Sequence, residues 1–190
     1  MKSILLIFVL LLSIPTLTAQ KKEIKRAQQE VRAKNYASAQ SYLDQAKRIF
    51  AAADSKTRAN YYVVEAELKL HQKELDAEQV LSISQSINLA KRYEVTQVLQ
   101  ERIAQIHLKI DKLSASIAAK EYTKKNYANA ASLYKTAYES SRDEVHLLKA
   151  ARCYLKAEAH HDAFQAYSSL LNKGYTNAKT QYVATIKIKV

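Results

Sequence analysis

The fold is decided by two stretches that lie 91 residues apart in the chain: Ala27–Ala46, A-Q-Q-E-V-R-A-K-N-Y-A-S-A-Q-S-Y-L-D-Q-A, and Ala118–Ala137, A-A-K-E-Y-T-K-K-N-Y-A-N-A-A-S-L-Y-K-T-A. They align without a gap and share A-x-x-E, K-N-Y-A-x-A and a final alanine. Each stretch predicts two helices that meet at a Lys-Asn corner, where we expect Asn35 or Asn126 to adopt the backbone conformation that glycine usually supplies. The alanines allow the two helices to approach closely, and tyrosine and leucine fill the space between them.

A further copy of this pattern follows 33 residues after the second one. It places small and large residues at matching offsets on two more predicted helices: Leu147, Ala150, Ala151, Tyr154, Ala163, Tyr167 and Leu170. The repeated pattern resembles the tetratricopeptide repeat, a helix–turn–helix unit of about 34 residues. The alternative is an antiparallel helical bundle that uses alanines at its contacts. The resemblance implies a helical domain over residues 20–174, with repeats near 20–50, 112–141 and 144–173 and a degenerate repeat over 57–92.

The segment between the first two copies predicts one long helix over residues 94–124. Its apolar residues recur at steps of three and four, which is the stripe of an amphipathic helix that runs into the repeat at Ala118. A coiled-coil seam is the alternative, but packing inside the monomer fits the short and irregular pattern better. The stripe consists of Val95, Val98, Leu99, Ile103, Ile106, Ile110, Leu113 and Ile117.

The composition favours an all-α fold. The 190 residues include one glycine and one proline, where an average chain of this length carries about 13 and 9. A glycine-rich nucleotide loop, a Rossmann fingerprint and most all-β folds are therefore excluded. The single glycine, Gly174, lies in N-K-G-Y-T, and we expect it to end a helix in a left-handed conformation.

The N-terminal residues 1–19 are typical of a secretory signal peptide. Lys2 precedes the apolar run Ile4–Leu12, Pro15 follows it, and Ala19 is a small residue at the expected cleavage position. A membrane-spanning helix needs about 20 apolar residues, and this run is shorter. We therefore expect a mature chain without a transmembrane segment. It would be exported to the periplasm, the outer membrane or the exterior.

The C-terminal residues 175–190 predict a short extended tail, because Tyr182–Val190 alternates apolar and polar residues with the period of a strand. The run K-G-Y-T resembles a continuation seen in exported bacterial tetratricopeptide proteins, in which further repeats follow. Two interpretations stay open, a short member of that group and a shortened gene product. A lone strand is not stable by itself, so the tail would pack on the last helix, fray, or add to a partner's sheet.

The sequence contains no pattern of catalytic or metal-ligating residues. It has no H-E-x-x-H pair, no Cys/His cluster with metal spacing and no nucleophile motif. His160 and His161 are adjacent and would point in different directions on a helix, so a solvated corner explains them better than a metal. Cys153, the only cysteine, fits a small packed core residue. We expect no enzyme activity, no cofactor and no metal.

The charge balance points to an anionic partner, unless the lysines only solvate exposed helix faces. The chain carries 30 Lys and Arg against 18 Asp and Glu, a net charge of +12. An exported protein meets little nucleic acid, so anionic surfaces of the cell envelope or acidic protein segments are the better candidates. A stacked array of helix pairs presents a concave surface lined by the first helix of each pair. We predict contacts at Lys149, Arg152 and Lys156 of the last repeat and at Lys112 and Tyr122 of the preceding one; the alternative is a solvated face.

Together these observations predict an all-α, tetratricopeptide-like solenoid with one long central helix and a short extended tail. Its predicted role is that of a non-enzymatic interaction or scaffold module of the bacterial cell envelope, because the resemblance implies an extended peptide bound along the first helices. The set of residues for a two-carboxylate clamp on a peptide C-terminus is not found. The alternative function is a basic helical holdase chaperone for unfolded outer-membrane clients. The export signal, the high charge and the long helix favour that alternative.

Overall fold

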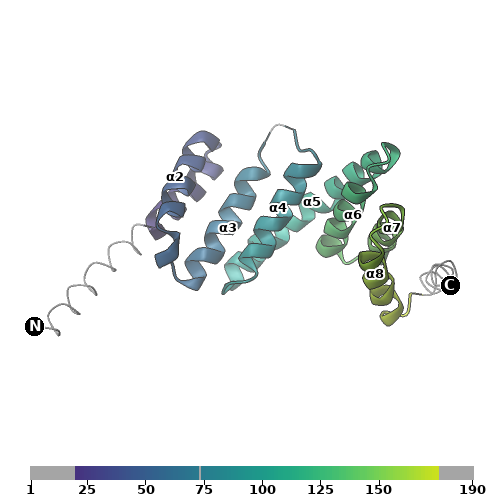
Figure 1. Cartoon of the computed structure of the whole chain (residues 1–190). Helices are drawn as coiled ribbons and strands as arrows, with labels where there is room; N and C mark the ends of the chain where they lie inside the picture. Colours follow the sequence, from purple (N-terminus) through teal and green to yellow (C-terminus); the bar gives the residue numbers. More distant parts are fainter. Residues whose placement is uncertain (1–19, 73, 176–190) are drawn as a thin grey trace, which may run out of the picture. The chain divides into compact units, whose positions relative to one another are not determined.

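The computed structural model describes residues 20–72 and 74–175, and this part of the chain is helical with short turns and no strand (Figure 1). The predicted all-α class is confirmed there, whereas the predicted signal peptide and the extended tail beyond Tyr175 lie outside the described residues. Residues 20–32 form the first described helical segment. It is followed by α2 (Tyr36–Arg48), the 3-10 turn η1 (Phe50–Ala52), α3 (Ser55–Lys69), α4 (Ala77–Ala90), α5 (Gln97–Thr123), α6 (Tyr127–Ser141), α7 (Glu144–Lys156) and α8 (His160–Asn172).

The predicted long helix is confirmed as α5, which runs unbroken for 27 residues. Val98 departs from the predicted apolar stripe, because its side chain is 65% exposed. Adjacent helix positions differ by about 100° in direction. Since Leu99 is buried, Val98 beside it points away from the core. The stripe that the structure buries consists of Leu99, Ile103, Ile106, Ile110 and Ile117.

The described residues divide into two compact units. The first contains the chain up to Glu74 together with Ser82–Ile106. The helix over residues 20–32 packs with α2 and α3, and alanines stand where these helices meet. Their small side chains allow close helix contact, as the repeated pattern predicts. The core of this unit consists of Ile24, Ala27, Val31, Ala39, Leu43, Ala46, Tyr61, Val64 and Leu68.

The second unit contains Leu75–Leu81 and the chain from His107 onward. Within it α6 packs against α7, and α7 packs against α8. Fully buried alanines again lie where the helices contact each other, and tyrosine and leucine side chains fill the remaining space. One cluster includes Ala118, Ala130, Ala131, Leu133, Tyr134, Ala150 and Cys153. The other includes Tyr138, Leu147, Leu148, Ala151, Ala166, Tyr167 and Leu170.

Three of the corners between paired helices use a left-handed residue, but that residue is not the predicted asparagine. Lys34 has φ 63°, Lys125 has φ 65° and Glu158 has φ 59°, whereas Asn35 has φ −91°. At the first corner the Lys34 N–H donates to the Val31 carbonyl (3.1 Å), and the Asn35 N–H donates to the Glu30 carbonyl (2.9 Å). This pair of bonds is the Schellman motif that ends helices.

The same pair of backbone bonds closes the other two corners. At the second, the Lys125 N–H donates to the Tyr122 carbonyl (3.0 Å) and the Asn126 N–H donates to the Glu121 carbonyl (2.9 Å). At the third, the Glu158 and Ala159 N–H groups donate to Leu155 and Tyr154 at 3.1 and 2.9 Å. The three corners therefore share one backbone geometry, although their sequences differ.

The asparagines have a different task, because each ties the corner to the preceding helix. Asn35 Nδ2 donates to Glu30 Oε2 at 2.9 Å, and Asn126 Nδ2 donates to Glu121 Oε2 at 2.8 Å. The bond from Asn126, together with one from Lys124, lowers the pKa of Glu121. This explains why glutamate and asparagine recur five residues apart in both copies of the pattern.

Gly174 ends α8 in the predicted left-handed conformation, with φ 76°. Its N–H donates to the Leu171 carbonyl (2.9 Å), and the Tyr175 N–H donates to the Leu170 carbonyl (3.0 Å). Tyr175 packs against the core cluster of α7 and α8. The exit from the last helix pair thus repeats the corner geometry, this time with glycine at the left-handed position.

The corner geometry predicts opposite effects of glycine at two exposed lysines. A left-handed backbone costs a residue with a Cβ about 1–2 kcal/mol, and glycine returns about 0.5–1 kcal/mol of this as extra unfolded-state entropy. Lys125→Gly should therefore raise the free energy of unfolding by about 0.5 kcal/mol. The control Lys109→Gly lies in the middle of α5 at an exposed position and should lower it by about 0.7 kcal/mol. Urea titrations followed by circular dichroism measure both; equal destabilisation would contradict the strain at Lys125.

The packing of Cys153 predicts a thiol that is inert in the folded protein. The residue is 1% exposed, and burial raises the pKa of its thiol to about 11. Because the thiolate is the reactive form, Ellman's reagent at pH 8 should label less than a tenth of the chains in native buffer and nearly all of them in 8 M urea, a concentration chosen to unfold a small domain. Rapid labelling of the native protein would contradict the burial of this residue.

Candidate partner-binding surfaces

A groove of about 360 Å³ runs over the first unit, and we call it the first-helix groove. Its lining comes from three successive first helices of the helix pairs, namely residues 20–32, α3 and the start of α5. This is the type of surface that the sequence predicts to face a partner, although it is formed by other residues than the five predicted. The lining consists of Lys21, Ile24, Gln28, Lys56, Thr57, Asn60, Thr96, Val98, Leu99 and Arg102.

The cation on α5 in this groove is held by α3. The Arg102 guanidinium donates two bonds to the Glu67 carboxylate, from Nε at 2.7 Å and from Nη2 at 2.6 Å. Its Nη1 donates to Asn60 Oδ1 at 2.8 Å. A paired fork of this kind is strong and fixes the orientation of both groups. It therefore aligns the start of α5 with α3.

The two lysines of the groove also face carboxylates. Lys21 Nζ lies 2.8 Å from Asp54 Oδ2, and Lys56 Nζ lies 3.1 Å from Glu94 Oε1. The bond from Lys21, with those from Thr57, lowers the pKa of Asp54 to about 2. The backbone N–H of Thr57 donates to Asp54 Oδ1 at 2.7 Å, so Asp54 also caps α3. The groove therefore offers balanced charges, polar side chains and one exposed apolar side chain, Val98.

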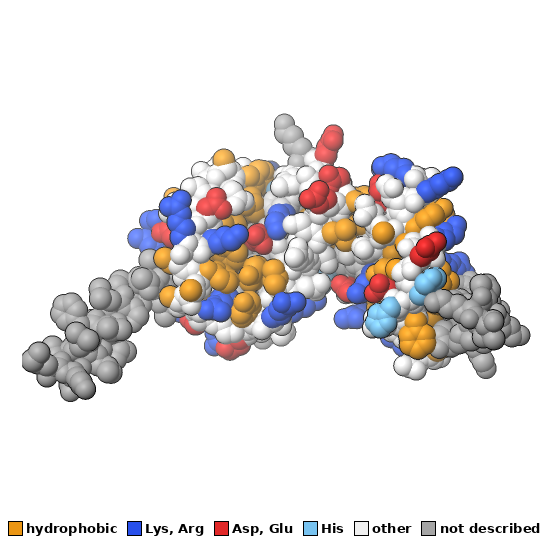
Figure 2. Space-filling model, viewed as in Figure 1, with side chains coloured by type: hydrophobic (Ala, Val, Ile, Leu, Met, Phe, Trp, Pro, Cys, Tyr) orange, Lys and Arg blue, Asp and Glu red, His pale blue; other side chains and the backbone are white. Residues whose placement is uncertain are grey.

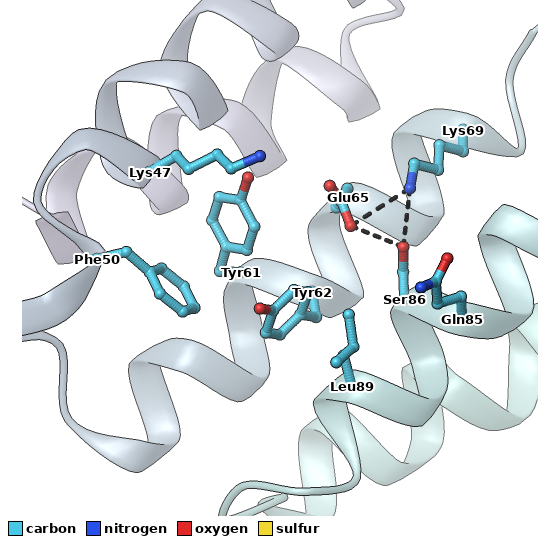
Figure 3. Close-up of a pocket in the computed structure, with 9 residues that line it drawn as sticks. All are labelled: Lys47, Phe50, Tyr61, Tyr62, Glu65, Lys69, Gln85, Ser86 and Leu89. Carbon is cyan, nitrogen blue, oxygen red and sulfur yellow. Dashed lines mark hydrogen bonds and ion pairs between the residues drawn. The ribbon is translucent and has the colours of Figure 1, made fainter.

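A second cavity of the first unit, about 250 Å³ in volume, lies among α2, η1, α3 and α4 (Figure 3). We call it the aromatic pocket. The rings of Phe50, Tyr61 and Tyr62 meet edge to face, with centres 5.1–5.5 Å apart. Figure 2 shows hydrophobic side chains bordered by Lys and Arg over the α2 and α3 part of the chain. The lining consists of Lys47, Phe50, Tyr61, Tyr62, Glu65, Lys69, Gln85, Ser86 and Leu89.

A polar network forms the opposite side of the aromatic pocket. The Ser86 hydroxyl donates to Glu65 Oε2 at 2.7 Å. Lys69 Nζ donates to Ser86 Oγ at 3.0 Å and lies 3.4 Å from Glu65 Oε2. Ser86 is 1% exposed, so its hydroxyl serves to join α4 to α3. Figure 3 shows the three groups on one side and the rings on the other.

Two of the five predicted site residues meet in the second unit. Lys156 Nζ lies 4.7 Å from the centre of the Tyr122 ring and 5.0 Å from that of Tyr127. The Tyr122 hydroxyl beside this ammonium raises the pKa of Lys156. An ammonium over an aromatic face is a cation–π contact. It ties the end of α7 to the corner between α5 and α6, while Lys156 itself stays exposed.

The remaining predicted residues lie apart from this pair. Lys149 Nζ lies 5.5 Å from the centre of the Tyr134 ring of α6. Arg152 is exposed and interacts electrostatically with Tyr167 of α8. Lys112 is exposed on α5. The three cations of α7 therefore interact with different tyrosines, which lie on α5, α6 and α8.

Neither cavity of the first unit is predicted by the sequence patterns. The aromatic pocket was signalled by the adjacent Tyr61 and Tyr62 after Phe50, but the pattern there is the least regular of the repeats. The groove depends on residues from three distant segments, and a single sequence does not show which of them meet. Val98 was placed in the buried stripe, although its exposure makes it the main apolar contact of the groove.

Over residues 20–72 and 74–175, no three His, Cys, Asp or Glu side chains gather in a way that would hold a metal ion. His161 contacts Gln165 through a 2.9 Å bond to its Nε2. In the same part of the chain, none of the helices combines the length and apolarity that crossing a bilayer requires. The surfaces described above remain as the candidate sites.

The sequence matches no family model, no curated protein and no solved structure.

Proposed function

We propose that this protein is a non-enzymatic protein-binding module built from tetratricopeptide-like helix pairs, and that it serves as a scaffold in the bacterial cell envelope. The observation that carries the proposal is the first-helix groove, which is lined by three successive first helices of the first unit. A surface of this kind extends over several elements, as the contact area for an extended segment must.

The recurring corner supports the repeat interpretation. The same left-handed turn follows the first helix of three pairs, at Lys34, Lys125 and Glu158. In the two aligned copies a glutamate–asparagine bond reinforces it. A generic bundle has no need to repeat one corner geometry, whereas an array of equivalent helix pairs does.

The chemistry of the groove suits the main chain of an extended partner. The Gln28 and Asn60 amides and the Thr57 and Thr96 hydroxyls are groups that both donate and accept hydrogen bonds. Val98 adds an exposed apolar contact. Because the groove's cations are paired with carboxylates, the partner does not have to desolvate an unpaired charge.

The groove is tested by replacing its exposed apolar residue. Val98→Glu should reduce partner binding at least tenfold, because burying a valine contributes about 1.5 kcal/mol or more and tenfold corresponds to about 1.4 kcal/mol. Leu108→Glu is the matched control, since Leu108 lies on the same helix, is 69% exposed and is outside the groove. Crosslinking with mass spectrometry in the producing cell identifies the partner, and titration with the purified partner measures the affinity. Equal binding by Val98→Glu and the wild type would contradict the groove.

A second candidate function is the holdase chaperone. It is favoured by the large apolar side chains that are exposed on several helices of this basic chain, Val98, Leu108, Val145 and Phe164. A holdase should suppress the aggregation of an unfolded outer-membrane barrel protein, whereas a scaffold should bind one native partner. Light scattering of the diluted client separates the two, and suppression by both Val98→Glu and the wild type would favour the holdase.

The α7 cations are tested independently of the groove. The double variant Arg152→Glu with Lys156→Glu should weaken the binding of an acidic partner about tenfold or more, because it reverses two charges at the predicted contact surface. Lys109→Glu with Lys135→Glu is the control, since both residues are exposed on α5 and α6. Circular dichroism checks that each variant is folded. Unchanged affinity of the Arg152 and Lys156 variant would remove these residues from the binding surface.

A further inference from the structure

The aromatic pocket has a chemistry that the first-helix groove lacks. Three rings form one side, and a polar network forms the other. In Figure 3 the Lys47 side chain reaches over Tyr61 from α2, and Lys47 is exposed. A cavity of about 250 Å³ is smaller than the roughly 300–1,000 Å³ of pockets that enclose drug-sized molecules. Its size therefore suits one side chain of a larger partner.

The charges of the pocket decide which kind of side chain fits. Aromatic rings around a cavity favour a cation when no positive charge stands nearby. Here Lys47 and Lys69 border the cavity, and the only carboxylate, Glu65, already faces Lys69 and accepts from Ser86. A cationic ligand would be repelled by Lys47 and Lys69, and the Glu65 carboxylate is already paired. An apolar or aromatic group would instead contact the rings, and an anion beside that group would face a lysine.

We propose that the aromatic pocket seats one aromatic side chain from an acidic segment of a partner protein. The incoming ring packs edge to face against the half-buried rings of Phe50 and Tyr62, which the buried Tyr61 ring supports, and aromatic pairs prefer this arrangement. Carboxylates next to that ring in the partner segment face Lys47. The inference rests on the proposed protein-binding function, and it adds the chemistry of the segment and a second point of contact.

In this proposal the aromatic side chain supplies most of the binding energy, and the charges around the pocket select the partner. Aromatic anchors in desolvated pockets supply much of the binding energy of protein interfaces, and surrounding charges steer the encounter and select the partner. The excess of Lys and Arg over the whole chain works in the same direction. Lys69 stays engaged with Glu65 and Ser86, which leaves Lys47 as the rim cation that a variant alters without breaking that network.

Labelled peptides test the pocket directly on the purified full chain. The probe is a fluorescein-labelled peptide with one phenylalanine between pairs of glutamates, and anisotropy measures its affinity. Three further probes replace the phenylalanine by alanine, replace the glutamates by lysines, or consist of N-acetylphenylalanine alone as an unlabelled competitor. The glutamate–phenylalanine peptide should bind at least tenfold more tightly than each of these, and its affinity should fall as salt is added.

Two pairs of variants locate the binding. Lys47→Glu should weaken the acidic peptide about tenfold, whereas Arg48→Glu should change it less than twofold, because Arg48 is an exposed neighbour outside the pocket lining. Gln85→Trp should block the cavity with a large ring, whereas Asn88→Trp on the same helix should not. All four positions are exposed, so the fold is expected to persist, and circular dichroism checks it.

Several outcomes would overturn the inference. Equal loss in Lys47→Glu and Arg48→Glu would indicate attraction to the basic surface alone, and tighter binding of the lysine peptide would indicate a cation cage. If N-acetylphenylalanine binds with the same affinity as the glutamate–phenylalanine peptide, the ligand would be a free aromatic acid. If none of the peptides binds, the proposal for the aromatic pocket is wrong. The proposal for the first-helix groove is not affected, since Val98→Glu with the native partner tests that groove separately.

Discussion

The left-handed corner between paired helices is the constraint on which the rest of the structure depends. With one glycine in the whole chain, the reversal at three of these corners falls to a residue that carries a side chain, Lys34, Lys125 or Glu158. The strain is offset by two backbone bonds, which satisfy carbonyls at the end of the first helix. Two corners add a glutamate–asparagine bond. Only when these reversals are tight do the alanines of the two helices face each other across a short distance.

That alanine contact in turn determines where larger side chains go. Tyrosines and leucines fill the space that the alanine contacts leave, and several of the tyrosine rings meet cations or each other there. Lys156 over Tyr122 and Tyr127 is one result, and the three rings of the aromatic pocket are another. The candidate surfaces are therefore direct products of the packing. Their lining residues come mainly from the helices themselves.

The local sequence pattern was sufficient to predict much of the fold, but it predicted little of the candidate binding surfaces. Helical class, the long α5 and the glycine-ended α8 follow from periodicity and composition, because these properties depend on neighbours within a few turns. The corner residue was misassigned, since asparagine's known tolerance of left-handed backbone obscured its bond to glutamate. Val98 was assigned to the buried stripe because Val98 and Leu99 are adjacent apolar residues, and the pattern alone does not show which of the two faces the core. The groove and pocket unite residues from distant helices, and their pairings depend on tertiary packing.

The solitary thiol in the α7 core gives the molecule a practical property. Because Cys153 is enclosed by packed alanines and rings, a cysteine introduced at an exposed position, such as that of Gln85 or Val98, is the only accessible nucleophile of its kind. Spectroscopic labels can therefore be attached site-selectively without first removing the native residue. Distances between a labelled partner segment and either surface then become measurable in the otherwise unaltered chain.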